Sequence, residues 1–327
     1  MTTISKRTFV TGLSLSMLGA TQTVCAQTAT YPARPVKVIV PFPAGGAADI
    51  TMRLLGPKLE QALGQSFVIE NRVGANGSIG ATAVARADAD GHTLLFAPRE
   101  VFSVNQSMQT SPGYDPIKDL APIGIATEGP YVLVAHPSLG IKNMASFLAA
   151  AKATELSYSS FGVGSMGHLN PEVLAQHAGV RFLHVPFRGG AAALQAVVGG
   201  DVAFSISTPP NAQGFIVDGQ VIGLAAGAAQ RLPQVPDVPT LAEVGLPLSI
   251  LTPAAFAMAA PAATPAPILA RLNSELTRAL AAPDVTATLA KAGLVPASGS
   301  PDAMARMIAA DGARFSALIK MLKIKPE

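Results

Sequence analysis

Tryptophan is absent from this chain of 327 residues, and tyrosine occurs only four times. Charged residues make up 13% of the chain, divided between 23 basic and 20 acidic side chains. Proteins that bind nucleic acids use aromatic platforms for the bases and basic stripes for the phosphates. Because the chain has neither feature, we expect no nucleic-acid partner.

The first 26 residues have the features of an export signal. Lys6 and Arg7 precede an apolar stretch at 9–24, which is too short and too weakly apolar for a convincing membrane span. Val24-Cys25-Ala26 then offers small or apolar residues at the positions that a signal peptidase reads. We predict cleavage after about Ala26 and a periplasmic location. Residues 5–10 loosely resemble a twin-arginine signal, so the export route stays open.

Cysteine is almost missing, and this absence limits the chemistry of the mature chain. Cys25 is the only cysteine and lies in the predicted signal. A disulfide, a thiol nucleophile and a zinc–thiolate site are therefore excluded after cleavage. No two histidines stand in His-x-x-x-His spacing, and we expect no metal, no cofactor and no catalytic residue. The signal holds two of the 23 basic residues and none of the 20 acidic ones, so cleavage lowers the net charge from +3 to +1.

A nine-residue segment recurs in shortened form in the second half of the chain. Val40-Pro41-Phe42-Pro43-Ala44-Gly45-Gly46-Ala47-Ala48 returns as Val185-Pro186-Phe187-Arg188-Gly189-Gly190-Ala191-Ala192. Each copy follows an apolar run and precedes an alanine-rich stretch, which predicts a strand, a Pro/Gly turn and a helix. Such turns direct backbone N–H groups and a helix N-terminus at whatever lies there, and this favours anions. The repeat predicts a ligand held between two lobes.

Strands and helices alternate along the rest of the chain. Apolar residues make up 49% of it, the mean hydropathy is +0.39, and the length suits two domains. The alternation predicts an α/β fold with two mostly parallel, doubly wound sheets. Strands are expected at 36–40, 66–70, 92–97, 122–127, 131–136, 156–160, 202–207, 221–226 and 256–260. Helices are expected at 49–63, up to 87, at 142–153, 171–177, up to 198, at 265–281, 283–292 and 301–322.

The expected domains form two lobes. Residues 27–126 and 253–327 make the discontinuous domain 1, and residues 127–252 make domain 2. The chain then crosses between the lobes twice, and two crossings form a hinge.

The order and spacing of several short motifs resemble those of one family. The matching segments are Pro41-Phe42-Pro43-Ala44-Gly45-Gly46, Glu70-Asn71-Arg72, Asp90-Gly91-His92-Thr93-Leu94-Leu95, Tyr114-Asp115-Pro116, His184-Val185-Pro186-Phe187-Arg188-Gly189-Gly190, Pro236-Asp237-Val238-Pro239-Thr240 and Ala281-Ala282-Pro283-Asp284-Val285. They resemble the extracytoplasmic receptors of tripartite tricarboxylate transporters, the Bug-type receptors. The resemblance covers nearly the whole mature chain.

The resemblance implies a periplasmic binding protein of the two-lobed Venus flytrap architecture. Such receptors are not enzymes: they capture a small organic acid and deliver it to the membrane subunits of a transporter. They hold the ligand carboxylates largely through backbone amides and ordered water at the strand-to-helix loops. We accordingly expect a monomeric receptor that uses no cofactor.

Three positions depart from the family pattern. Ala48 replaces a polar residue, and Gly167 replaces a hydroxyl residue before His168. Ala97-Pro98-Arg99-Glu100 stands where small hydroxyl or glycine residues are common. These changes remove hydroxyl groups and add an arginine, so they bear on which acid is bound.

We predict a ligand site without catalytic or metal-binding members. The proposed ligand-binding residues are Phe42, Ala44, Gly45, Gly46, Ala47, Asp49, Arg99, Gly164, Ser165, Met166, His168, Arg188, Gly189, Gly190 and Thr208. Asp49 is expected to hold the shape of its loop and His168 to support its own loop by hydrogen bonding. Arg99 could hold a carboxylate in a bidentate fork, or be a surface residue paired with Glu100 or another carboxylate.

The other candidates also have alternative explanations. Gly45 and Gly46 could simply form a tight turn, Arg188 could be solvated, Thr208 could cap a turn, and Phe42 could belong to the core.

Two alternative functions remain open at this point. Ser165, His168 and Asp49 could form the triad of a secreted hydrolase, but the Gly-x-Ser-x-Gly context is missing because residue 163 is valine. The protein could also be a sensory module that presents its ligand to a signalling partner.

Overall fold

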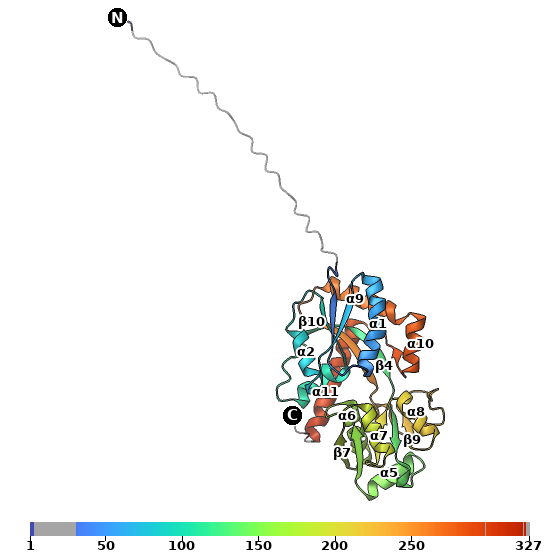
Figure 1. Cartoon of the computed structure of the whole chain (residues 1–327). Helices are drawn as coiled ribbons and strands as arrows, with labels where there is room; N and C mark the ends of the chain where they lie inside the picture. The colour runs from blue at the N-terminus through green and yellow to red at the C-terminus, as the bar shows by residue number, and fades with distance from the viewer. Residues whose placement is uncertain (3–30, 298, 323, 325–327) are drawn as a thin grey trace. The chain divides into compact units, whose positions relative to one another are not determined.

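The computed structural model describes residues 1–2, 31–297, 299–322 and 324. The predicted signal and its cleavage site lie outside the described residues. Tyr31–Glu327 form one compact unit, and this unit contains two β-sheets, each with its own helices (Figure 1). The predicted α/β, two-lobed fold class is confirmed.

The first lobe is built on a six-stranded sheet with the order β11-β4-β10-β3-β1-β2. Its strands are β1 (Val36–Val40), β2 (Phe67–Asn71), β3 (Thr93–Pro98), β4 (Leu120–Gly129), β10 (Ala254–Pro261) and β11 (Val295–Pro296). Strand β1 lies between β2 and β3 and is parallel to both, whereas β10 runs antiparallel to β3 and β4. The associated helices are α1 (Ala47–Leu63), α2 (Ser78–Ala85), α3 (Arg99–Ser103), α4 (Asn105–Met108), α9 (Ala266–Leu280), α10 (Pro283–Lys291) and α11 (Pro301–Met321), with the 3₁₀ turn η1 (Ala75–Gly77).

The second lobe is built on a five-stranded sheet with the order β7-β6-β8-β5-β9. Its strands are β5 (Val132–Ala135), β6 (Leu156–Ser160), β7 (Phe182–Pro186), β8 (Phe204–Ser207) and β9 (Ile222–Ala226). Strand β6 is parallel to β7 and β8, and β5 is antiparallel to its neighbours. Its helices are α5 (Met144–Ala153), α6 (Met166–Ala178), α7 (Gly190–Val198) and α8 (Pro209–Val217), and 3₁₀ turns occur at η2 (Pro137–Leu139) and η3 (Leu248–Ile250).

The chain passes from one sheet to the other twice. It leaves the first sheet after Gly129, enters the second at Val132, and returns between Ala226 and Ala254. Strand β4 continues three residues past Ala126, where we expected the first domain to end. The predicted domain boundaries and the hinge movement stay predictions.

Local sequence signals account for the ends of several helices. Gly64 follows α1 in the left-handed conformation, with φ of 74°, and its amide donates to the Glu60 carbonyl, which makes it the C-cap of the helix. Asn143 caps α5, and Asn143 and Ser146 form a reciprocal capping box.

Three features differ from expectation. Helix α6 begins at Met166 and not at Pro171, because the proline lies inside the helix instead of opening it. Two short helices, α3 and α4, follow β3, and no periodic apolar pattern in the sequence predicts them. Each sheet is mixed, because β10 returns antiparallel from the second crossing and β5 enters antiparallel after the first.

Candidate functional site

The two repeated segments form equivalent loops at the carboxyl ends of β1 and β7. Gly45 has φ of 79° and Gly189 has φ of 98°, conformations that glycine adopts without the strain of a side chain. Both loops are exposed, and a Cβ atom built on Gly45, Gly189 or Gly190 would meet no heavy atom within 4 Å. The predicted strand–loop–helix repeat is therefore present, with open space beside each loop.

The helices that follow these loops begin with unsatisfied backbone donors. Among the described residues, no side chain caps the N-terminus of α1 or α7. The first N–H groups of a helix have no partner within it, and they lie at the positive end of the helix dipole. The N-termini of α1 and α7 therefore suit anionic groups, whereas α8 begins with Pro209 and Pro210, which have no N–H group to offer.

Asp49 fixes the first loop from within helix α1. Its carboxylate accepts hydrogen bonds from the Gly45 amide at 2.9 Å, from Asn71 Nδ2 at 3.0 Å and from Arg53 Nε at 2.9 Å. Burial raises the pKa of this carboxyl, but the three hydrogen bonds outweigh burial and hold it below its usual value. The expectation that Asp49 holds the shape of the loop is confirmed.

The loop before α6 has its own internal supports. The Ser165 hydroxyl donates to the Gly162 carbonyl at 2.6 Å, and the Gly164 amide donates to His168 Nδ1 at 3.2 Å. The predicted supporting role of His168 is confirmed. Because Ser165 and His168 each use another partner, and Asp49 is bonded to Gly45, these three residues do not form the triad of a hydrolase.

A stack of rings lies behind this loop. The rings of His168 and His184 are parallel with centroids 4.0 Å apart, and His184 also stacks on Tyr158. Burial lowers the pKa of His168 to about 3, helped by His184, and lowers that of His184 to about 4. Both rings are therefore neutral at physiological pH, which His168 requires in order to accept the Gly164 hydrogen bond through Nδ1.

The carboxyl ends of the two sheets meet at Glu100. This residue follows β3, and its Oε1 accepts a hydrogen bond from the backbone amide of Met166, which follows β6, at 2.9 Å. A Cβ atom on Gly164 would lie 3.3 Å from Asn76 Nδ2 and 3.4 Å from Met108 Cγ. The loop before α6 therefore packs directly on the first lobe.

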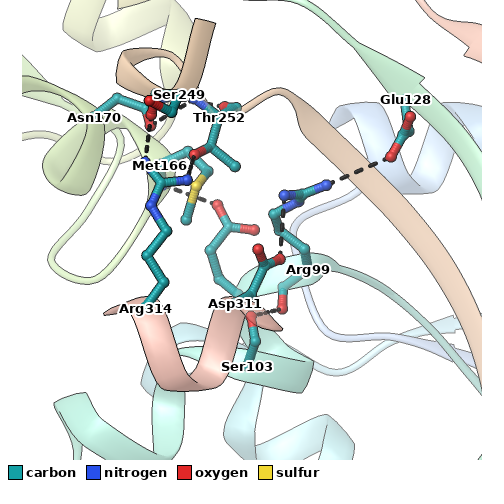
Figure 2. Close-up of polar contacts among 10 residues, drawn as sticks. Arg99, Ser103, Glu128, Met166, Asn170, Ser249, Thr252, Asp311 and Arg314 are labelled. Carbon is teal, nitrogen blue, oxygen red and sulfur yellow. Dashed lines mark hydrogen bonds and ion pairs between the residues drawn. The ribbon is translucent and has the colours of Figure 1, made fainter. Parts of the chain in front are cut away.

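Arg99 is buried and already paired within the chain (Figure 2). Its Nη1 lies 3.1 Å from Asp311 Oδ2, and its Nη2 lies 3.5 Å from Glu128 Oε1. Of the alternative explanation, the pairing with another carboxylate is confirmed, but the surface location is wrong, because only 5% of Arg99 is exposed. Its Nε has no hydrogen-bond partner among the described residues. Contact of Arg99 with a ligand stays a prediction, in competition with these two carboxylates.

A second set of polar contacts surrounds Thr252, near the return crossing (Figure 2). Arg314 Nη1 donates to Thr252 Oγ1 at 2.8 Å, and Arg314 also donates to the Ser249 carbonyl. Asn170 in α6 exchanges two hydrogen bonds with the Thr252 backbone, at 3.0 and 3.1 Å. These contacts join α11 and α6 through the segment that connects the sheets.

The remaining candidates lie near the loops but have less defined roles. Arg188 is exposed, Phe42 is half-buried against core residues, and Thr208 occupies the N-cap position of α8 without a side-chain capping bond. Ser207, the last residue of β8, is 4% exposed, and its hydroxyl lacks a partner among the described residues. It is a further donor at the carboxyl end of the second sheet.

Glu100 and Asp311 were missed as site residues by sequence reasoning. Residues 97–100 differ from the family pattern, and this difference was the available signal for Glu100. Arg99 was chosen as the candidate from this segment instead. No local pattern marked Asp311 inside the long helix α11.

A hollow of about 520 Å³ lies elsewhere on the first lobe. Arg34, Lys37 and His92 are among its lining residues, near the amino ends of β1 and β3 and thus at the opposite ends of these strands from the loops. Two of its basic groups have acidic partners, since Arg34 pairs with Asp90 and Lys37 with Glu70. None of the predicted ligand-binding residues lines it.

The described residues contain no group of three or more His, Cys, Asp or Glu side chains that could hold a metal ion. Within the same residues, every helix is too short or too polar to cross a membrane.

Comparison with known proteins identifies relatives along almost the whole chain. A family described as "Tripartite tricarboxylate transporter family receptor" matches residues 51–324. Protein BugT of Bordetella pertussis is 34% identical over 314 residues, which cover 95% of each chain.

Two solved structures from Rhodopseudomonas palustris carry organic acids. Rpa4515 with adipate is 33% identical, has a TM-score of 0.81, and is matched over 91% of this chain and 100% of its own. MatC (Rpa3494) with bound malate is 34% identical, has a TM-score of 0.77, and is matched over 88% and 100% respectively. The chain belongs to the tripartite tricarboxylate transporter receptor family, whose members are solute-binding proteins.

Proposed function

We propose that this protein is an exported, non-enzymatic receptor that binds a small organic carboxylate between its two lobes in the periplasm. It then delivers the acid to the membrane subunits of a tripartite transporter. The observation that carries the proposal is the pair of open loops at Gly45 and Gly189, each leading into a helix whose first N–H groups have no side-chain cap. The adipate and malate in related structures are of the ligand class that such loops suit.

The proposed chemistry is recognition by fixed dipoles. A carboxylate at the start of α1 or α7 accepts hydrogen bonds from backbone N–H groups, and each such charge-assisted bond is stronger than a neutral one. Glycine at these turns lets the ligand approach the backbone closely. Asp49 fixes the position of the Gly45 amide before the ligand arrives, so less ordering is needed on binding.

The alternative functions have less support. A hydrolase needs a nucleophile bonded to a base, whereas the Ser165 hydroxyl donates to Gly162 and His168 accepts from Gly164. A sensory role would use the same ligand site with a different partner, and no structural feature favours it over transport.

A melting-temperature screen of organic acids tests the proposal. A ligand that binds only the folded state stabilises it by about 2.7 kcal/mol at 100 times its Kd. We expect at least one small carboxylate to raise the melting temperature and to be recovered unchanged by mass spectrometry. Conversion of a stabilising acid to a product would contradict the receptor function, and so would the absence of any stabilising acid.

A further inference from the structure

One side chain of the first lobe is bonded to the backbone of the second lobe. Glu100 Oε1 accepts the hydrogen bond of the Met166 amide at 2.9 Å, and Met166 is the first residue of α6. Glu100 is 6% exposed and Met166 is fully buried, so water does not compete for this bond while the lobes are together. Both partners belong to the chain, and the bond therefore requires no ligand.

The residues around this bond are packed across the same boundary. Gly164, two residues before Met166, lies against Asn76 and Met108 of the first lobe, as the distances from its Cβ position show. Asn76 is held in turn by Asn105, whose Oδ1 accepts from Asn76 Nδ2 at 3.0 Å. Met108 and Met166 belong to one continuous apolar cluster. The Glu100 bond thus lies inside a packed contact between the lobes.

Helix α6 keeps such contacts farther along its length. Asn170 exchanges two hydrogen bonds with the Thr252 backbone, in the segment that returns to the first sheet (Figure 2). Gln176 Nε2 lies 3.5 Å from Met321 Sδ in α11. The start, middle and end of α6 are therefore each joined to residues outside the second sheet.

The two repeated loops are not part of this contact. Gly45 and Gly189 are exposed, and a Cβ atom on either would meet no heavy atom within 4 Å. The lobes are thus in contact at α6, while the loops proposed to take the ligand are open. A ligand that reaches these loops meets two lobes whose separation is already set by the chain.

We propose that Glu100 is a positioning residue: it fastens the start of α6 to the first lobe without a ligand and so fixes the separation of the Gly45 and Gly189 loops in advance. The effect on affinity rests on the proposed function, since it presupposes an acid that binds at these loops. The effect on the lobes themselves does not. Binding to a site arranged in advance is tighter, because the free energy of bringing the lobes together is not subtracted from it.

The distance between two spin labels tests the arrangement of the lobes directly. Cys25 is the only cysteine of the chain, so Cys25→Ser leaves two engineered cysteines as the only labelling sites. Gln61→Cys in α1 and Gln195→Cys in α7 place one label at an exposed position of each lobe. Double electron–electron resonance should give the same single distance for the unliganded protein and for the protein saturated with the best acid of the melting screen. A second, longer distance that disappears when the acid is added would overturn the inference.

Two variants of Glu100 separate the hydrogen bond from a general effect on the fold. Glu100→Ala removes the acceptor and should add a longer distance in the unliganded protein. Glu100→Gln retains an amide oxygen that can accept the bond of the Met166 amide, so it should keep the wild-type distance. Gln234→Ala is the matched control, because Gln234 Nε2 also donates across the lobes, to the Ala290 carbonyl at 3.1 Å, but at a solvent-exposed position. It should keep the wild-type distance as well.

A third variant removes the donor instead of the acceptor. Met166→Pro has no amide hydrogen at this position, and proline is well tolerated as the first residue of a helix. Ser165 already has the extended backbone that a following proline requires, with ψ of 164°. Met166→Pro should therefore add the same longer distance as Glu100→Ala, and it decides the matter if Glu100→Ala does not fold.

Calorimetric titration with the acid gives the second readout. If about one tenth of the unliganded Glu100→Ala molecules keep the wild-type arrangement, the apparent Kd rises by about 10-fold. Glu100→Gln and Gln234→Ala should stay within about 3-fold of the wild-type Kd. At saturation, the acid should restore the wild-type distance in Glu100→Ala.

The outcomes separate this inference from the proposed function. A folded Glu100→Ala protein with the unliganded distance of the wild type overturns the role of Glu100, whether or not an acid binds. A longer distance in Glu100→Ala that Glu100→Gln does not share supports this role even if no acid binds the wild type, and in that case the proposed function alone fails. A longer distance in Glu100→Ala without any loss of affinity contradicts the link between Glu100 and the ligand loops.

Discussion

The carboxylate of Asp49 accepts a hydrogen bond from the amide of Gly45, four residues earlier in the chain, at 2.9 Å. The first turn of α1 thus holds the exposed loop that precedes it. Asp49 is 2% exposed and also accepts from Arg53 and Asn71. A buried acid next to a proposed acid-binding loop therefore acts as a support and not as a ligand contact.

Replacing Asp49 should weaken both the fold and the binding of an acid. Asp49→Ala leaves the Gly45 amide without its partner, and we expect the free energy of unfolding to fall by about 1–3 kcal/mol. We also expect about 10-fold weaker binding of the stabilising acid, because the loop loses its fixed shape. Urea unfolding and calorimetric titration measure the two effects, with exposed Asp218→Ala as the control. Unchanged affinity in a folded Asp49→Ala protein would show that binding of the acid does not depend on the shape of this loop.

A methyl group on Gly45 should affect binding more than stability. Gly45→Ala places Cβ in open space but at φ of 79°, so we expect a cost of about 1–2 kcal/mol from the backbone. Gly140 has φ of 64° and similarly open surroundings, so Gly140→Ala should be destabilised to a similar degree. Only Gly45→Ala should also lose affinity for the acid. Equal affinities of the two variants would argue against contact at the first loop.

Removing Arg99 should mainly destabilise the fold. Arg99→Ala leaves Asp311 buried without its cation, and breaking a buried ion pair costs about 3–5 kcal/mol. Arg99→Ala/Asp311→Ala should recover part of this loss. Arg34→Ala, which breaks an exposed pair with Asp90, should cost less than about 1 kcal/mol. An Arg99→Ala protein of normal stability that binds the acid poorly would instead support the ligand contact suggested by sequence.

The stacked histidines should make the second lobe sensitive to acid. The pKa values of His168 and His184 are lowered to about 3 and about 4, so their folded forms resist protonation while the unfolded chain takes up protons below about pH 6.5. The contribution of these two histidines to the free energy of unfolding is therefore fully present above about pH 6.5. It decreases as the pH falls toward their lowered pKa values.

The effect of one histidine can be isolated with a ring that does not titrate. Between pH 7 and pH 4.5, we expect His184→Phe to lose about 2 kcal/mol less unfolding free energy than the wild type. His177 is exposed, and His177→Gln should lose as much unfolding free energy as the wild type between these pH values. Urea unfolding at both pH values checks this difference, and equal losses in all three proteins would mean that His184 titrates normally.

The loops were predictable because their signals are local. Proline and glycine after an apolar run, followed by alanine-rich sequence, determine a strand, a turn and a helix within about 15 residues. Asp49 and His168 could be assigned as supports because each lies four residues from the glycine that it binds, Gly45 and Gly164 respectively.

The contacts between distant segments were not predictable in this way. Glu100 and Met166 are 66 residues apart, and their bond depends on how the two sheets face each other. Arg99 meets Asp311 only because α11 returns to the first lobe at the end of the chain. Helix α3 has five residues, too few for a periodic pattern, and a proline inside α6 concealed the true start of that helix.

The central claim is that backbone amides at the two repeated loops hold the acid. Amide chemical shifts of the ¹⁵N-labelled protein, followed during titration with an acid from the melting screen, test it directly. The claim predicts that the largest shift changes fall on the amides of Ala47, Ala48, Gly189 and Gly190, at the starts of α1 and α7, and saturate with the calorimetric Kd. Saturating changes confined to other parts of the chain, with these four amides unmoved, would contradict it.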